Sequence, residues 1–269
     1  MITRTLRAGG VALLAALAMA STSALAQEAA TVPTGTLTIA VPQDPATLDP
    51  QMHRQRHAQT IAHNHLDKLF YQPPPGIGYA PLLAESLTKI DDFHYEVKLH
   101  EGVHFQSGDE LTAEDVVYTY QRMWDPANKS PRANMGNMPN IESIEAVDRY
   151  TVRWTTKVPF GDINNAITDL ALASQEILHK DFYEKLTLEE ARTSFGDGAG
   201  PFTIVEWTPD QQIVMKAFHD YWQGPAKVET IIWRTIPEEA PRVAELLAGS
   251  VDIIYPVSPD YVDQLKAAG

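Results

Sequence analysis

The sequence of 269 residues contains no cysteine. Disulfide frameworks are therefore excluded, and no thiol is present to carry a lipid anchor. This absence argues against a small disulfide-stapled protein and against a lipoprotein. Stability has to come from a hydrophobic core, and a hydrophobic fraction of 44% is enough to build one.

Basic residues are scarce. The chain has 21 lysines and arginines against 35 aspartates and glutamates, for a net charge of −14. Such a surface repels nucleic acid and anionic lipid. We therefore expect no nucleic-acid partner, and a neutral or cationic ligand is compatible with this charge.

Long hydrophobic runs are missing after the first 20 residues, so no later segment is expected to span a membrane. At the start, Arg4 and Arg7 precede an apolar run over residues 8–20, and the small-residue motif 24–26 is followed by Gln27. This order is typical of a cleavable secretory signal. We predict a signal peptide over residues 1–26 and a mature protein that is soluble in the periplasm; an uncleaved anchor is the alternative.

The remaining pattern predicts an α/β protein, because period-two strands alternate with amphipathic helices. We expect strands at residues 35–41, 93–99, 150–155, 202–207, 212–218, 230–236 and 251–255, and helices at 58–70, 163–178, 182–191, 240–247 and 259–267. The final strand–helix–strand–helix alternation predicts strands lying side by side. A turn at Pro209 and Asp210 should join the strands before and after it.

A capping box opens the helix that follows residue 112. Thr112 and Asp115 have the spacing at which a hydroxyl and a carboxylate satisfy free amides at a helix start. Val116, Tyr120 and Met123 then fall on one apolar face. Asp125-Pro126 should end this helix.

Four segments resemble one known family, the family 5 extracytoplasmic solute-binding proteins of ABC importers, of the oligopeptide, dipeptide or nickel-binding type. They follow the order and spacing of the family across the mature chain. His100 departs from the family, which usually has arginine there. The segments are GTLTIAVPQDPATLDP, LLAESLTKIDDFHYEVKLHEGVHFQSGDELTAEDVVYTYQRMWDP, GAGPFTIVEW and HDYWQGPAKVETIIWRTIPEEAPRVAELLAGSVDII.

The resemblance implies a periplasmic binding protein-like fold of type II, cluster C. Family members are considerably longer than this chain, so the resemblance implies lobe I with an inserted extra domain and without the C-terminal lobe. The expected division is a signal peptide at 1–26, the first part of lobe I at 27–75, the extra domain at 76–180 and the second part of lobe I at 181–269.

The resemblance also implies a function. The protein would be the periplasmic substrate-binding component of an ABC importer, capturing a short peptide or related small solute and delivering it to the membrane subunits of an inner-membrane permease. We expect a monomer without a cofactor, and no enzyme, because no GxSxG motif is present. The alternatives are a binder of nickel or haem-type metal complexes and a truncated remnant that no longer transports.

Four histidines lie within residues 53–65. Helical spacing places His65 on the apolar face, where a core role is expected. His53 and His57 are spaced to share a polar face, but no third metal ligand accompanies them, so we expect no metal site. In the resembled family the loop at 42–57 approaches the ligand cleft, and this implies that His53, Arg54 and Arg56 are ligand contacts; solvated charges are the alternative.

A loop rich in Asn and Met at residues 130–138 is the second candidate for ligand contact. Similar loops in peptide-binding relatives reach over the cleft. Arg132 or Asn134 would pair with a ligand carboxylate or backbone amide, and Met135 with Met138 would form an adaptable apolar wall. An ordinary exposed loop is the alternative.

The glycine-rich segment GDGAGPF, residues 196–202, is not a phosphate loop, because the lysine and the following helix are absent. Its glycines would let backbone pass close to the ligand or form a tight crossing between domains. The matching family segment lies at the cleft edge, which implies ligand contacts from Asp197, Gly198 and Ala199.

Overall fold

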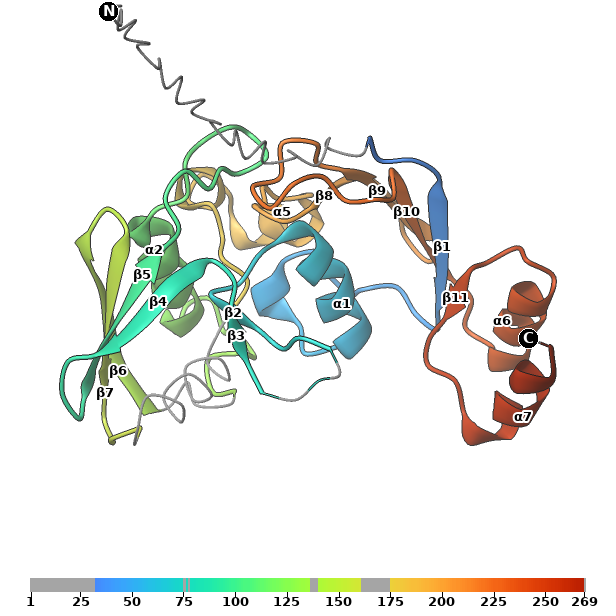
Figure 1. The fold of residues 1–269 in the computed structure, drawn as a ribbon, viewed down its shortest axis with the longest axis horizontal. Helices are drawn as coiled ribbons and strands as arrows, with labels where there is room; N and C mark the ends of the chain where they lie inside the picture. The colour runs from blue at the N-terminus through green and yellow to red at the C-terminus, as the bar shows by residue number, and fades with distance from the viewer. Residues whose placement is uncertain (1–31, 75, 77, 136–139, 161–174, 269) are drawn as a thin grey trace, which may run out of the picture. The chain divides into compact units, whose positions relative to one another are not determined.

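A five-stranded sheet joins the first strand of the chain to the last (Figure 1). The computed structural model describes residues 32–74, 76, 78–135, 140–160 and 175–268. The sheet has the order β11-β1-β10-β9-β8, with β1 parallel to both β10 and β11 and the other pairings antiparallel. Its strands are β1 (Thr36–Val41), β8 (Phe202–Thr208), β9 (Gln212–Ala217), β10 (Thr230–Thr235) and β11 (Ile253–Ile254).

A second sheet has four antiparallel strands in the order β4-β5-β7-β6. Side chains of β5 and β7 alternate between buried and more exposed positions, as period-two strands do when one face covers a core. The strands are β4 (Ala84–Lys89), β5 (His94–Leu99), β6 (Ile141–Asp148) and β7 (Thr151–Thr156). A short pair, β2 (Phe70–Tyr71) and β3 (Ala80–Pro81), stands apart from both sheets.

The helices are short and mostly amphipathic. They are η1 (Pro50–Met52), α1 (Arg56–His65), α2 (Ala113–Trp124), α4 (Lys180–Tyr183), α5 (Leu188–Thr193), α6 (Glu239–Leu247) and α7 (Pro259–Ala268). Thr112 and Asp115 form the expected contact at the start of α2, where the Thr112 amide donates to the Asp115 carboxylate at 2.8 Å. None of the helices among the residues described has the length and apolar character of a membrane span.

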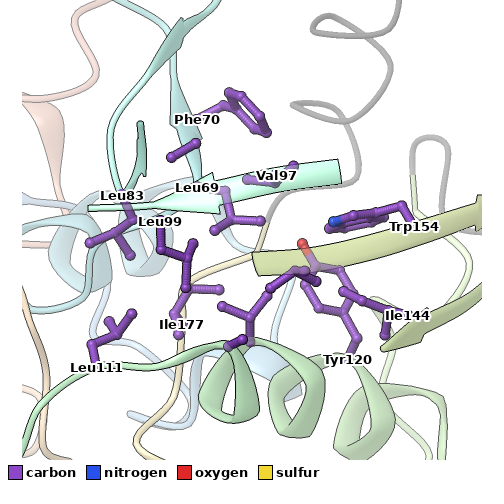
Figure 2. Packing of buried hydrophobic residues seen from close by; sticks show 14 of the residues in the cluster. Leu69, Phe70, Leu83, Val97, Leu99, Leu111, Tyr120, Ile144, Trp154 and Ile177 are labelled. Atoms are coloured by element: carbon purple, nitrogen blue, oxygen red, sulfur yellow. The ribbon is translucent and has the colours of Figure 1, made fainter. Parts of the chain in front are cut away.

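The main core lies between α2 and the second sheet (Figure 2). Tyr120 of α2 and Trp154 of β7 are fully buried and meet edge to face, with ring centroids 4.8 Å apart. Leu99 and Val97 of β5 close the same cluster. A separate cluster, which includes Ile61 of α1 and Trp233 of β10, packs α1 against the five-stranded sheet.

Most expected strands are confirmed, whereas three helices and one strand pairing are wrong or only partly described. The helix expected to reach Phe70 ends at His65, because the chain then extends into β2. Residues 161–174 lie outside the described residues, and 175–178 are not helical. The helix expected at 182–191 is two short helices, since Thr187 caps a new one. The strands β10 and β11 are not adjacent, because β1 lies between them.

The second sheet comes entirely from residues 84–156, between two strands of the first sheet. Contacts nevertheless make the chain from Thr31 onward one compact unit. The four sequence divisions given above stay predictions.

Candidate functional site

A buried ion pair holds the loop between β1 and α1 in place. Asp49 has no exposed surface and accepts the Gln51 amide at the start of η1. Arg122 of α2 contacts the Asp49 carboxylate at 2.5 Å and the side-chain oxygen of Gln51 at 2.7 Å. The Gln51 amide group in turn donates to the Thr119 carbonyl at 2.7 Å. These contacts with α2, the helix that packs on the second sheet, therefore fix the position of the loop.

His53 and His57 are buried rather than placed on a polar helix face. His53 precedes α1 and the helix starts only at Arg56, so the two imidazoles do not share a helical face. Burial, reinforced by the charge of Arg132, lowers the pKa of His53 to about 4. Burial also lowers the pKa of His57. Both rings are therefore neutral at pH 7.

His65 is a core residue, as its position on the apolar face predicts. It is 2% exposed, and its Nδ1 lies 3.1 Å from the Phe202 carbonyl oxygen. Since that carbonyl is an acceptor, Nδ1 carries the proton and burial lowers the pKa of the ring. The imidazole thus links α1 to β8.

Arg132 is the centre of a second buried cluster. Its Nε donates to the His53 carbonyl at 3.0 Å, and its Nη1 donates to the Gln175 side chain at 3.0 Å and to Glu176 at 2.5 Å. Its side chain is only 4% exposed. The remaining nitrogen, Nη2, is buried and has no hydrogen-bond partner among the residues that the structure describes.

The two carboxylate oxygens of Glu176 contact side chains of two different segments. Oε2 contacts Arg132, and Oε1 lies 2.8 Å from Nε2 of His63 on α1. Burial opposes ionisation, but the charges of Arg132 and Lys68 and the His63 contact outweigh it and hold the pKa of Glu176 well below its usual range. The carboxylate is therefore ionised, and it fixes the Nη1 side of the Arg132 guanidinium.

This cluster forms one wall of a pocket of about 650 Å³. The size is within the range typical of small-molecule sites. Apolar and aromatic side chains make up part of the lining: Leu66, Phe70, Tyr71, Tyr79, Leu82 and Met135. Hydrogen-bonding or ionisable side chains make up the rest: Gln59, His63, Asp67, Lys68, Gln72, Arg132, Gln175 and Glu176. We call this space the Arg132 pocket.

Asp67 is a buried carboxylate on the wall of the Arg132 pocket. Its Oδ2 accepts hydrogen bonds from the Tyr221 hydroxyl at 3.0 Å and the Trp222 indole at 2.9 Å. Burial raises the pKa of Asp67 to about 6, against the opposing effect of these donors. The three side chains join the segment after α1 to the segment after β9.

The glycine-rich segment lies against the end of α1. The Gly200 amide donates to the His65 carbonyl at 2.9 Å, and a Cβ added to Gly198 would lie 1.9 Å from that oxygen. Asp197 accepts hydrogen bonds from the Ser107 amide at 3.0 Å and the His179 ring at 2.6 Å. The close approach that these glycines allow is thus to protein backbone.

The sequence-predicted residues fall into distinct environments. Arg132 and Met135 line the Arg132 pocket, whereas His53 lines a separate cavity of about 10 Å³. Three others are exposed and do not line the Arg132 pocket: Arg54, Arg56 and Asn134. Asp197, Gly198 and Ala199 are buried outside it. Met138 lies outside the described residues.

Sequence reasoning missed three side chains of this site: His63, Asp67 and Glu176. Glu176 was assigned to a helix, and its partners come from segments more than 40 positions away. No local motif marks such a contact. Among residues placed in the structure, no group of three His, Cys, Asp or Glu side chains is positioned to hold a metal ion.

Comparisons with known proteins give a consistent result. The profile described as "Bacterial extracellular solute-binding proteins, family 5 Middle" matches residues 78–269. The glutathione-binding protein GsiB of Escherichia coli O1:K1 / APEC is 33% identical over 261 residues, which are 93% of this chain and 46% of that protein. The oligopeptide-binding protein AppA of Bacillus subtilis (strain 168) is 33% identical over 181 residues, 66% of this chain and 33% of that protein.

The same likeness holds for solved structures. The periplasmic binding protein DppA of Helicobacter pylori, solved in complex with the peptide STSA, superposes with a TM-score of 0.74 at 26% identity. The match covers 87% of this chain and 49% of that structure. The chain therefore spans about half, or less, of the length of the proteins it matches.

Proposed function

Because the chain belongs to family 5 of the bacterial extracellular solute-binding proteins, we propose that it is the substrate-binding component of an ABC importer that captures a short peptide or related small solute. Over the part that it shares with the solved structures, the chain has the fold of a periplasmic binding protein. In this proposal residues 1–26 direct export, and the loaded protein delivers its solute to permease subunits in the inner membrane.

The observation that carries the proposal is the Arg132 pocket. It combines aromatic and apolar side chains with a larger number of polar ones, and its volume is within the range of sites for small organic molecules. Within the described part of the chain, Arg132 has one buried nitrogen without a hydrogen-bond partner. Relatives named for oligopeptides and for glutathione support a solute of the peptide class.

Of the described residues predicted from sequence, we propose Arg132 and Met135 as direct contacts. Arg54, Arg56 and Asn134 are exposed and stay predicted contacts. The remaining four residues also stay predicted contacts, although hydrogen bonds or packing within the protein already involve each of them. They are His53, Asp197, Gly198 and Ala199.

Thermal shift and calorimetry on the complete gene product test the proposal. Short peptides, including glutathione, are added to protein that lacks residues 1–26. A ligand that binds only the native state raises its melting temperature, so at least one peptide should do so in proportion to its concentration. If the whole panel leaves the melting temperature unchanged, the proposal is wrong.

A further inference from the structure

A second pocket lies at the start of α2 and shares no lining residue with the Arg132 pocket. Its volume is about 640 Å³, within the range typical of small-molecule sites. The turn before α2, the end of β6 and the start of α4 contribute to its walls. We call it the acidic pocket after the carboxylates that line it: Asp109, Glu110, Glu114, Asp115, Asp148 and Asp181.

The carboxylates of the acidic pocket outnumber its basic side chains. Glu110 pairs with Arg149, and Glu114 pairs with Lys180. Within the described part of the chain, the other four carboxylates of the lining form no ion pair with a lysine or arginine. A hollow lined by charges of one sign concentrates the field and attracts ions of the opposite sign. The acidic pocket therefore attracts cations.

His179 lines the acidic pocket with one free ring nitrogen. The residue is only 6% exposed, and its ring is stacked on Phe105. Nδ1 lies 2.6 Å from the carboxylate of Asp197, which is not part of the lining. Because a carboxylate accepts hydrogen bonds, Nδ1 carries the proton and donates it. Nε2 is therefore the ring nitrogen on the side of the pocket.

Nε2 of His179 has no hydrogen-bond partner among the residues that the structure describes. Oδ2 of Asp109 lies 3.7 Å away, beyond hydrogen-bond distance, and accepts only a long bond of 3.3 Å from the Ser107 hydroxyl. In the neutral ring Nε2 is an acceptor as well, since the proton is on Nδ1. Two acceptors thus face each other across a gap that a single donor group could bridge.

An organic ammonium group meets these requirements better than a metal ion. A stable metal site needs three or four converging ligands, and no such group of His, Cys, Asp or Glu exists among the described residues. An ammonium group has three N–H donors, and its bonds to carboxylates are of the short, strong type. Asp148 and Asp181 lie on other segments of the lining, so a cation with several ammonium groups would satisfy more of the pocket than a single amine.

We propose that the acidic pocket binds a small organic polycation of the polyamine class, with one ammonium group between Nε2 of His179 and the carboxylate of Asp109. Further ammonium groups bind Asp148 and Asp181. Asp197 is a positioning residue, because it determines which nitrogen of His179 faces the pocket without touching the ligand. This site is separate from the Arg132 pocket, so the outcome of its test leaves the proposed function untouched.

Three amine probes test the ligand class on the complete protein without residues 1–26: spermidine, cadaverine and pentamethonium. Pentamethonium has the chain length and charge of cadaverine but no N–H donor. Calorimetry in about 0.15 M salt, which screens diffuse attraction to the negative surface, should show saturable binding of one spermidine per protein. Pentamethonium should bind about tenfold more weakly than cadaverine, because it cannot donate to Nε2 or to the carboxylates.

Two results would overturn the proposal at this stage. Equal affinities of cadaverine and pentamethonium would show that charge alone attracts the ligand. Saturable binding of zinc chloride without binding of any amine would make the pocket a metal site.

Asp109→Asn connects the binding to the pocket. The side chain of Asp109 is 69% exposed, so its replacement leaves the core intact, and the affinity for spermidine should fall about tenfold. Glu189→Gln is the matched control, because it removes the same charge from an exposed residue of α5 that pairs with Arg192 outside the pocket. It should keep the affinity within about twofold. Equal losses in the two variants would mean diffuse attraction and contradict the proposal.

Nitrogen NMR of the histidine side chains tests the contact with His179 in the unmodified protein. Spermidine should shift the Nε2 signal of His179, which gains a hydrogen bond. His219 is the internal control, because its Nε2 already contacts Glu229 on the surface at 3.0 Å. An unchanged His179 signal in the saturated protein, or an equal shift of His219, would overturn the assignment.

Discussion

Two nitrogens of Arg122 bind the carboxylate of Asp49, although the two residues are 73 positions apart in the sequence. Nη2 lies 2.5 Å from Oδ2 and Nη1 lies 3.3 Å from Oδ1. Asp49 is fully buried and Arg122 nearly so. Together they attach the loop after β1 to the last turn of α2, so that the loop and the helix are fixed relative to each other.

Arg122→Ala should lower the free energy of unfolding by about 3–5 kcal/mol, because it leaves the Asp49 carboxylate buried and unpaired. Denaturant unfolding of the purified protein measures this. Arg153→Ala, which removes an exposed arginine with two surface ion pairs, should cost at most about 1 kcal/mol. Similar losses for the two variants would show that the buried pair has no special role.

Gly198→Ala should destabilise the protein by about 3 kcal/mol or prevent folding, because the new methyl group would overlap the His65 carbonyl oxygen. Gly102→Ala is the matched comparison. Gly102 has a φ of 72° and no atom within 4 Å of an added Cβ, so it should cost only the backbone strain of about 1 kcal/mol. Melting temperatures of both variants test the difference, and the reverse order would contradict the packing of Gly198 on α1.

His53 should make the protein less stable in mild acid. Its folded pKa of about 4 lies below the unfolded value of 6.5, so only the unfolded state takes up the proton between these values. Stability is therefore lost as the pH falls from about 6.5 to about 4. Between pH 7 and pH 4.5 this amounts to about 2 kcal/mol. The His53→Gln variant should lose that much less, and an unchanged pH dependence would argue against a neutral, buried His53.

Asp67 should act in the opposite direction. Its folded pKa of about 6 lies above the unfolded 3.8, so the folded state holds the proton more tightly, and this contribution disappears as the pH rises through 6. The wild-type protein should lose about 2 kcal/mol of stability through this group between pH 4 and pH 8, and Asp67→Asn should remove that loss. The amide oxygen still accepts from Tyr221 or Trp222. Unfolding curves at the two pH values measure the effect, and a larger loss in the variant would show the wrong sign.

Local patterns predicted the local structure well. The capping contact of Thr112 with Asp115 and the apolar face of α2 require only neighbours within one or two turns, and both are present. The alternation in β5 likewise reflects one buried face. By contrast, the helix expected up to Phe70 was wrong, because the apolar residues Leu69 and Phe70 belong to the main core after the helix has ended.

The site depended on contacts that no short pattern encodes. Arg132 was predicted from its residue type and loop, but Glu176 and His63, which orient it, lie in other segments. Gly198 and Gly200 were predicted to let backbone pass close to the ligand or to form a tight crossing between domains, and in the structure they lie against the His65 carbonyl. Residue types thus suggested where partners are needed, whereas the partners themselves are chosen by tertiary packing.

The position of β1 between β10 and β11 has a consequence for folding kinetics. Thr36 lies opposite Thr230, and Ile39 lies opposite Ile253. The strand β1 therefore cannot pair with β10 before residues 230–235 are available, or with β11 before residues 253–254 are available. Long-range pairing of this kind slows folding, because loop-closure entropy is paid before the contacts form. The second sheet lies entirely within residues 84–156, so we expect it to fold first. Until β10 and β11 are available, β1 stays an unpaired strand, which exposes backbone groups that can pair with other chains.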